Sequence, residues 1–168
     1  MEQGSTGPPG WLLTLATTLE SSPLGAAMRD SIFLYPLVNV VHLAGLVLVV
    51  GAIGLLDLRL LGVARQVSVA AVYPILTRIA VLGIVVQMSS GLMLFAAEAS
   101  ALLRNDAFLL KMLLLSAALA NAGVFRLVWR PEIAAWDEHA PLLGRAQAAL
   151  SLLLWIAVGV LGRLIAYL

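Results

Sequence analysis

A single histidine lies within a long apolar segment of this sequence. His42 is the only acidic or basic side chain between Ile32 and Leu56, and this segment is longer than the ~20 apolar residues that a helix needs to cross a bilayer. An ionisable ring inside hydrocarbon is costly, so such a residue marks by default a binding site or a specific partner. His42 is therefore the first candidate for a functional residue.

Methionines and basic side chains of the other apolar segments lie at similar depths and extend this candidate site. Haem iron accepts histidine, or histidine with methionine, as axial ligands. His42 would be one axial ligand to the metal, and Met93 or Met112 the second. Lys111 and Arg163 would hold the propionates, because cationic side chains suit carboxylates. The predicted haem b site consists of His42, Gly45, Met93, Lys111, Met112 and Arg163.

Two other interpretations of the same residues stay open. Histidine and methionine also suit Cu(I), which is a soft ion, but Met88 and Met93 are five positions apart and so point to different faces of one helix. Alternatively, His42 hydrogen-bonds a carbonyl or Gln87 across helices. The methionines would then fill gaps in the packing, and the basic side chains would extend to the lipid headgroups.

The composition places the chain in a membrane. Hydrophobic residues make up 62% of the 168 residues and charged residues 11%, whereas soluble domains have about 45–50% and about 25%. The length allows one domain, residues 1–168, and the net charge of +1 suggests no nucleic-acid partner. Cysteine is absent, which excludes disulfides and thiolate metal sites. The first ten residues contain no Lys or Arg, so we expect no cleavable signal peptide.

Four segments are long enough to span a bilayer, and lipid requires each of them to be a helix. They are residues 33–56, 74–97, 107–128 and 147–167, with a lead-in over 69–73. The predicted fold is an all-α integral membrane four-helix bundle. Residues 11–20 are too short to span, and their apolar side suits a helix on the membrane surface. Ser22 and Pro23 predict the start of a second short helix, and residues 131–136 predict another in the third loop.

The distribution of Lys and Arg predicts the orientation of these spans, because basic residues favour the cytoplasmic side. One side carries Arg59, Arg65, Arg78, Arg126, Arg130 and Arg145. The opposite side carries Arg29, Arg104, Lys111 and Arg163. This imbalance places both termini in the periplasm of a protein of the bacterial inner membrane.

Acidic residues near the span ends predict structural ion pairs. Asp57 comes at the expected end of the first span, where a carboxylate opposes the helix dipole and needs a cation. Arg78 or Arg126 lies at the right depth to supply it. A proton or ion entry site at Asp57 is the alternative. Glu98 is expected to pair with Lys111 or Arg104.

Several runs of residues together resemble a known family. They are His42-Leu-Ala-Gly45, Gly51, Asp57-Leu-Arg-Leu-Leu-Gly62, Gly91-Leu-Met-Leu-Phe95, Phe108, Lys111, Asn121, Trp155, Gly162-Arg163 and Ala166-Tyr167. The pattern resembles an uncharacterised family of small bacterial four-helix membrane proteins. That family is distantly similar to the copper-resistance D proteins and to small haem-binding membrane proteins of the protoporphyrinogen oxidase type. Both similarities imply a functional histidine in the first span.

The sequence departs from this family pattern at one position. Members often have a second histidine near the end of the third span, where this chain has Arg126. The remaining histidine, His139, lies beside two acidic residues in a loop, where we expect it to be solvated. The resemblance therefore implies a site with His42 as its single imidazole.

These observations favour a protein that holds a cofactor over an enzyme. No GxGxxG turn, Walker loop, HExxH or GxSxG motif is visible. The leading hypothesis is a haem b protein for electron transfer or redox sensing, although haem can also supply chemistry that the chain does not reveal. The alternatives are a permease-like protein for copper or another small solute, and an accessory subunit that docks a membrane protein partner or a second copy of itself.

Overall fold

The structure, a computed structural model, describes residues 8–138, 140–165 and 167. Within these residues the chain is helical and has no strand. The elements are, in chain order, α1 (Gly10–Glu20), α2 (Pro23–Asp30), α3 (Leu34–Leu61), α4 (Val69–Leu102), α5 (Asp106–Trp129), η1 (Ile133–Asp137) and α6 (Leu142–Leu164). Helices α3 to α6 are long and apolar enough to cross a membrane. The chain is thus a multi-pass membrane protein, and the predicted all-α bundle of four spanning helices is confirmed.

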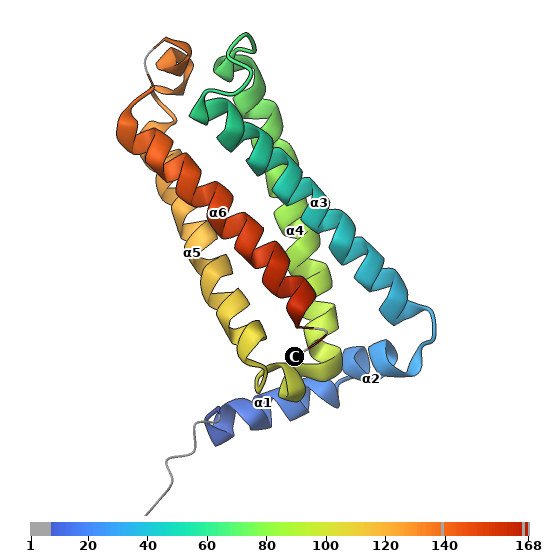
Figure 1. The fold of residues 1–168 in the computed structure, drawn as a ribbon. Coiled ribbons are helices and arrows are strands. Elements are labelled where there is room, and N and C mark those ends of the chain that lie inside the picture. The colour runs from blue at the N-terminus through green and yellow to red at the C-terminus, as the bar shows by residue number, and fades with distance from the viewer. Residues whose placement is uncertain (1–7, 139, 166, 168) are drawn as a thin grey trace, which may run out of the picture.

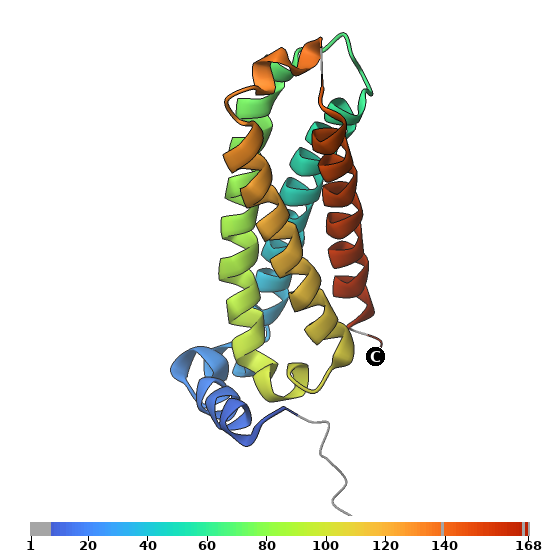
Figure 2. The ribbon, with the colours of Figure 1, turned by 90° about the vertical axis from the view of Figure 1, so that its left-hand side faces the viewer.

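The four long helices pack as an antiparallel bundle (Figure 1; Figure 2). Helix α3 packs against α4 and α6, and α5 packs against α6. Helices α4 and α5 make few contacts with each other within the described chain, so the seam between them is the least closed of the four. One end of the bundle, here called the terminal end, carries α1, α2 and the end of α6 (Figure 1). The opposite end, the loop end, carries the α3–α4 connection and η1.

The first spanning helix is longer than predicted. Helix α3 continues past residue 56 to Leu61 and ends on Gly62, whose φ of +106° favours glycine. Asp57 and Arg59 therefore lie inside the last turns of the helix and not after it. The prediction followed hydropathy, which marks the apolar core of a helix and misses the polar turns that extend beyond it.

The second and fourth spanning helices also extend beyond their apolar cores. Helix α4 includes Pro74 near its start and continues to Leu102 through a kink at Glu98 (φ −142°, ψ 38°). Helix α6 begins at Leu142, five positions before the predicted residue 147. The backbone hydrogen bonds of a helix need no apolar side chains, so hydropathy alone stops short of the end of α4 and of the start of α6.

Glycines bring the backbones of α3 and α4 close together. A Cβ atom added at Gly83 would lie 2.8 Å from the backbone nitrogen of Val49, and one added at Gly45 would lie 3.1 Å from that of Gln87. Neither site can accept a side chain without moving the neighbouring helix. Small residues allow this close approach in a bilayer, where packing drives helix association. The two helices thus form a tight pair that fixes the side chains along their contact.

Polar contacts join α5 to α6. The indole nitrogen of Trp129 donates to the side-chain oxygen of Gln147 at 2.8 Å. The side-chain amide of Gln147 donates in turn to the backbone oxygen of Asn121 at 3.2 Å. Hydrogen bonds of this kind replace those that water would offer outside a membrane. The bundle therefore consists of two helix pairs joined along α3 and α6.

The short N-terminal helices pack against the kinked end of α4. Ser22 caps α2, as predicted, and its hydroxyl accepts from the backbone nitrogen of Gly25 at 3.2 Å. The Glu20 carboxylate accepts from the hydroxyl and the backbone N–H of Ser100, each at 2.7 Å. These two bonds hold the pKa of Glu20 below its ordinary value. Arg29 donates to the backbone oxygen of Ala97 at 3.1 Å, so both short helices are fixed to α4.

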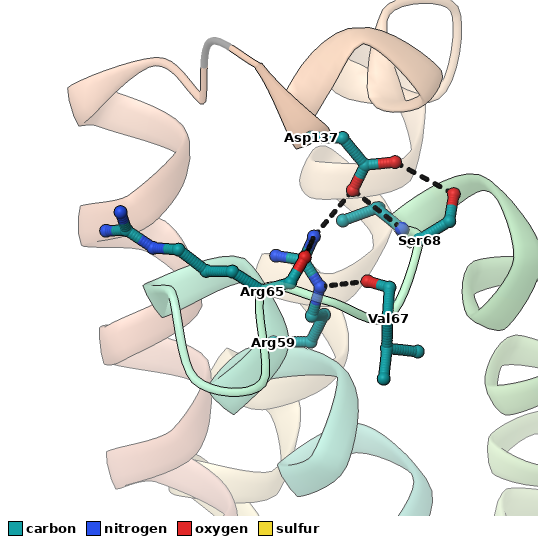
Figure 3. A network of polar contacts seen from close by, with 6 residues as sticks. Arg59, Arg65, Val67, Ser68 and Asp137 are labelled. Carbon is teal, nitrogen blue, oxygen red and sulfur yellow. Dashed lines mark hydrogen bonds and ion pairs between the residues drawn. The ribbon is translucent and has the colours of Figure 1, made fainter.

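An ion pair closes the loop end, as Figure 3 shows. The Arg59 guanidinium lies 2.6 Å from the Asp137 carboxylate of η1 and donates to the Val67 backbone oxygen at 2.5 Å. Asp137 also accepts from the Val69 backbone N–H and the Ser68 hydroxyl, both at 2.8 Å. These bonds, followed by the Arg59 charge, hold the pKa of Asp137 below its ordinary value. The ion pair fixes η1, predicted as a short helix in this loop, over the start of α4.

Candidate functional site

The imidazole of His42 is hydrogen-bonded to a serine of the neighbouring helix. His42 is half-buried on α3, and its Nδ1 lies 2.9 Å from the Ser90 hydroxyl oxygen of α4. The Ser90 hydroxyl itself donates to the backbone oxygen of Val86 at 2.5 Å. A hydroxyl has one hydrogen to donate, so Ser90 must accept from His42. In a neutral ring the proton is therefore on Nδ1, and the free lone pair is on Nε2.

The surroundings of the ring hold it in one orientation. The side-chain nitrogen of Gln87 donates to the His42 backbone oxygen at 2.9 Å, whereas the alternative considered from the sequence was a bond between Gln87 and the imidazole. The ring itself lies over Gly91, where an added Cβ would be 3.1 Å from the His42 Cε1 atom. Within the described residues, no hydrogen bond joins Nε2 to the protein. The lone pair on Nε2 of this fixed imidazole therefore has no hydrogen-bond partner in the described chain.

Lys111 brings a positive charge to the same layer. Its side chain comes from α5 and is half-buried, with Nζ 3.6 Å from the position of a Cβ added at Gly162 of α6. The ammonium group lies within electrostatic range of His42. The bundle therefore gathers α3, α4, α5 and α6 around one level, with His42 and Gly91 on one side and Lys111 and Gly162 on the other. This convergence was expected from the depths of the residues in the sequence.

The other residues predicted for this site have different surroundings. Met93 packs in a cluster with Met28, Val38 and Ala97, toward the terminal end. Met112 is 42% exposed on α5. Arg163 is exposed and lies over the Tyr167 ring, 4.9 Å from its centroid, with a hydrogen bond to the Tyr167 hydroxyl. Within the described residues, no group of three or more His, Asp or Glu side chains could hold a metal ion.

The structure gives Asp57 a different environment from the predicted ion pair. Asp57 is 5% exposed, lies near the Ser151 hydroxyl of α6, and its Oδ2 atom has no hydrogen-bond partner among the described residues. The one ion pair in the described chain joins Arg59 to Asp137. Asp57 is paired with neither Arg78 nor Arg126, because α3 continues past it and turns the carboxylate toward α6.

Glu98 also lacks the predicted partner in the described chain. It is exposed at the kink of α4 and lines a cavity of about 430 Å³ together with Glu20 and Arg29. It forms no ion pair with Lys111 or Arg104. The kink turns its side chain toward the N-terminal helices and away from the bundle.

Comparison with known proteins identifies the family. A family model described as a family of unknown function, DUF6644, matches residues 20–168. The chain belongs to the DUF6644 family. The match includes all four spanning helices, His42 and the loop-end ion pair, and it agrees with the expected uncharacterised family. No curated protein and no solved structure matches the chain.

Sequence reasoning missed two polar contacts in this DUF6644 chain. Ser90 lies three positions after Gln87, on the face of α4 that carries Gly83 and Gly91, and that face could have drawn attention to it. The contact between Arg59 and Asp137 joins residues 78 positions apart, and no local signal predicts it. His139, which the sequence predicts to be solvated in the loop before α6, lies outside the described residues.

Proposed function

We propose that the chain is a membrane protein that holds a metal-centred cofactor through Nε2 of His42, with haem b as the candidate, for electron transfer or redox sensing. The observation that carries this proposal is the pair of hydrogen bonds at Ser90. The Ser90 hydrogen is committed to Val86, so His42 must donate from Nδ1 and keeps its lone pair on Nε2. A metal ligand needs that lone pair.

The rest of the layer supports this proposal. Histidines that bind metals usually donate their other ring N–H to a protein acceptor, which fixes the ring, and Ser90 is that acceptor here. Gly91 lets the ring pack against α4, because a Cβ atom there would lie 3.1 Å from the Cε1 atom of His42. Lys111 supplies a charge that suits a propionate carboxylate. The haem would supply an iron that accepts and returns one electron at a time, and His42 would hold that iron from one side.

The copper alternative has less support in the side-chain arrangement. Met93 packs among Met28, Val38 and Ala97, and Met88 is 62% exposed. A soft ion needs several sulfur or nitrogen ligands around one point. The described residues that surround His42 supply hydroxyl, amide and ammonium groups instead.

The absorbance spectrum of protein purified in detergent tests the proposal. Cells supplied with a haem precursor should give protein with a Soret band and a reduced-minus-oxidised α band, at one haem per chain. His42→Ala should lose both bands. Asn39→Ala, an exposed substitution one turn earlier on α3, should keep them. Colourless wild-type protein that binds Cu(I) through His42 would favour the copper alternative. Colourless protein that binds neither would reject a cofactor role.

We also propose that the terminal end faces the periplasm of a bacterial inner membrane. The loop end carries most of the arginines that flank the spans, including Arg59, Arg65 and Arg78. Because the chain has no cysteine, single cysteines report the orientation without background. Cysteine at Ser21, between α1 and α2, should react with an impermeant maleimide in intact spheroplasts. Cysteine at Gln66, in the α3–α4 loop, should react only after lysis; the reverse pattern would invert the topology.

A further inference from the structure

A cavity lined by three arginines lies at the loop end, between α4 and α5. Its volume is about 640 Å³. Arg78 comes from α4, Arg126 from the last turn of α5, and Arg130 from the residue that ends α5. The hydroxyl-bearing side chains of Tyr73 and Thr77 also line it. None of these residues belongs to the layer around His42.

No negative charge lines this cavity. Its lining contains no Asp or Glu, and none of the three arginines forms an ion pair within the described chain. The one carboxylate within η1, that of Asp137, is already bound by Arg59, Ser68 and Val69. Three like charges in one cavity repel each other, more strongly as water is replaced by protein and lipid. The arrangement is therefore complementary to an anion with several acceptor oxygens.

The position of the cavity indicates the source of that anion. It lies where two spanning helices end, along the seam where α4 and α5 make few contacts. One turn deeper on α4, Val81 lines the cavity and is 48% exposed, and Val124 of α5, two positions deeper than Arg126, is 51% exposed. Apolar side chains below and basic side chains above match a lipid with its headgroup at the surface. A small soluble anion has no apolar group that could contact the apolar side chains below the arginines.

We propose that the cavity binds the phosphate headgroup of an anionic phospholipid, with the acyl chains along the outer faces of α4 and α5. Guanidinium groups bind phosphate oxygens through two parallel hydrogen bonds, and basic pockets between spanning helices bind anionic headgroups. Arg126 and Arg130 are one turn apart and approach from one helix, while Arg78 faces them from the other. The Thr77 hydroxyl supplies a further donor. This site is independent of the cofactor proposed at His42.

Lipid-dependent thermal unfolding of delipidated protein tests this site. Phosphatidylglycerol or cardiolipin in detergent should raise the melting temperature, and phosphatidylcholine with the same acyl chains should not. Arg126→Gln should weaken the apparent affinity for the anionic lipid about tenfold, as expected for the loss of charge-assisted hydrogen bonds. The apparent lipid affinity of Arg126→Lys should lie between those of the wild type and Arg126→Gln, because lysine keeps the charge but lacks the planar guanidinium group.

Matched controls separate this site from general charge effects. Arg104→Gln removes an exposed arginine at the terminal end and should leave the lipid response unchanged. If Arg126→Gln does not fold, native mass spectrometry of lipid adducts on Arg78→Gln and Arg130→Gln gives the same comparison. Equal stabilisation by phosphatidylcholine, or a response that survives Arg126→Gln, would overturn the proposal. So would full stabilisation by inorganic phosphate alone, which would show a site for a free anion.

Discussion

Nδ1 of His42 and the Ser90 hydroxyl lie 2.9 Å apart across the contact of α3 and α4. This bond is possible because Gly83 and Gly91 let the two helices approach along the face that carries Ser90. The close approach of α3 and α4 places the Ser90 hydroxyl against Nδ1, and it thereby leaves Nε2 as the free ring nitrogen. The helix pair therefore determines the one lone pair that a metal could use.

Ser90→Ala should weaken cofactor binding without unfolding the protein. The substitution removes the acceptor of the Nδ1 proton, so the ring loses its fixed orientation and tautomer. Loss of such an outer partner typically costs about 10–100-fold in metal affinity, which a haem titration followed at the Soret band would measure. Ser89→Ala is the matched control, because Ser89 is exposed and bonds only its own helix at Val85. Equal effects of the two substitutions would remove Ser90 from the site.

Glycine substitutions should separate the packed face of α4 from open positions in the bundle. At Gly83 an added methyl group would meet the Val49 backbone nitrogen at 2.8 Å, so Gly83→Ala should destabilise the protein by about 1–3 kcal/mol, as overpacking does. At Gly123 of α5 nothing lies within 4 Å of an added Cβ. Gly123→Ala should be neutral or stabilising by up to ~1 kcal/mol through helix propensity. Unfolding in mixed detergent micelles measures both, and equal effects would contradict the described contact of α3 with α4.

The fold could be predicted largely from the sequence because lipid leaves few choices. A long apolar segment in a bilayer must be a helix, and four such segments form a bundle. The helix ends were harder to predict, since α3 continues through the polar residues Asp57 and Arg59 to Gly62. Gly62 caps α3, and hydropathy does not indicate such a cap.

The candidate site could be predicted only in part. Depth along each span predicts that His42 and Lys111 lie at one level, because helices have a constant rise, and the Lys111 charge lies close enough to act on His42. The rotation of each helix about its axis decides which residues at that level face the bundle interior. A uniformly apolar helix gives little sign of which face turns inward. Met112 was therefore expected in the site and lies 42% exposed, and Asp57 was expected to meet an arginine and faces α6 near Ser151 instead.

Acid should weaken the ion pair that closes the loop end. The pKa of Asp137 lies below its ordinary value of 3.8, owing to bonds from Val69 and Ser68 and to the Arg59 charge. A lowered folded-state pKa contributes stability above the ordinary value, and this contribution is lost as the pH falls through the lowered value. Asp137→Asn should thus lower the melting temperature at neutral pH and make it less sensitive to pH below about 4. A double-mutant cycle with Arg59→Gln measures the coupling; if the two effects simply add, the ion pair contributes nothing.

Asp57→Asn tests whether the buried carboxyl lacks a cationic partner. Breaking a buried ion pair from one side costs about 3–5 kcal/mol, because it leaves an uncompensated charge. Asp57 has no such partner in the described chain, and its Oδ2 atom accepts no hydrogen bond. Asparagine keeps the shape, carries no charge to bury, and could donate to the Ser151 hydroxyl. We therefore expect the free energy of unfolding to stay the same or rise. A loss of the size expected for a broken ion pair would show that Asp57 is paired with a cation in the bilayer, and Ser151→Ala would then show whether α6 positions that pair.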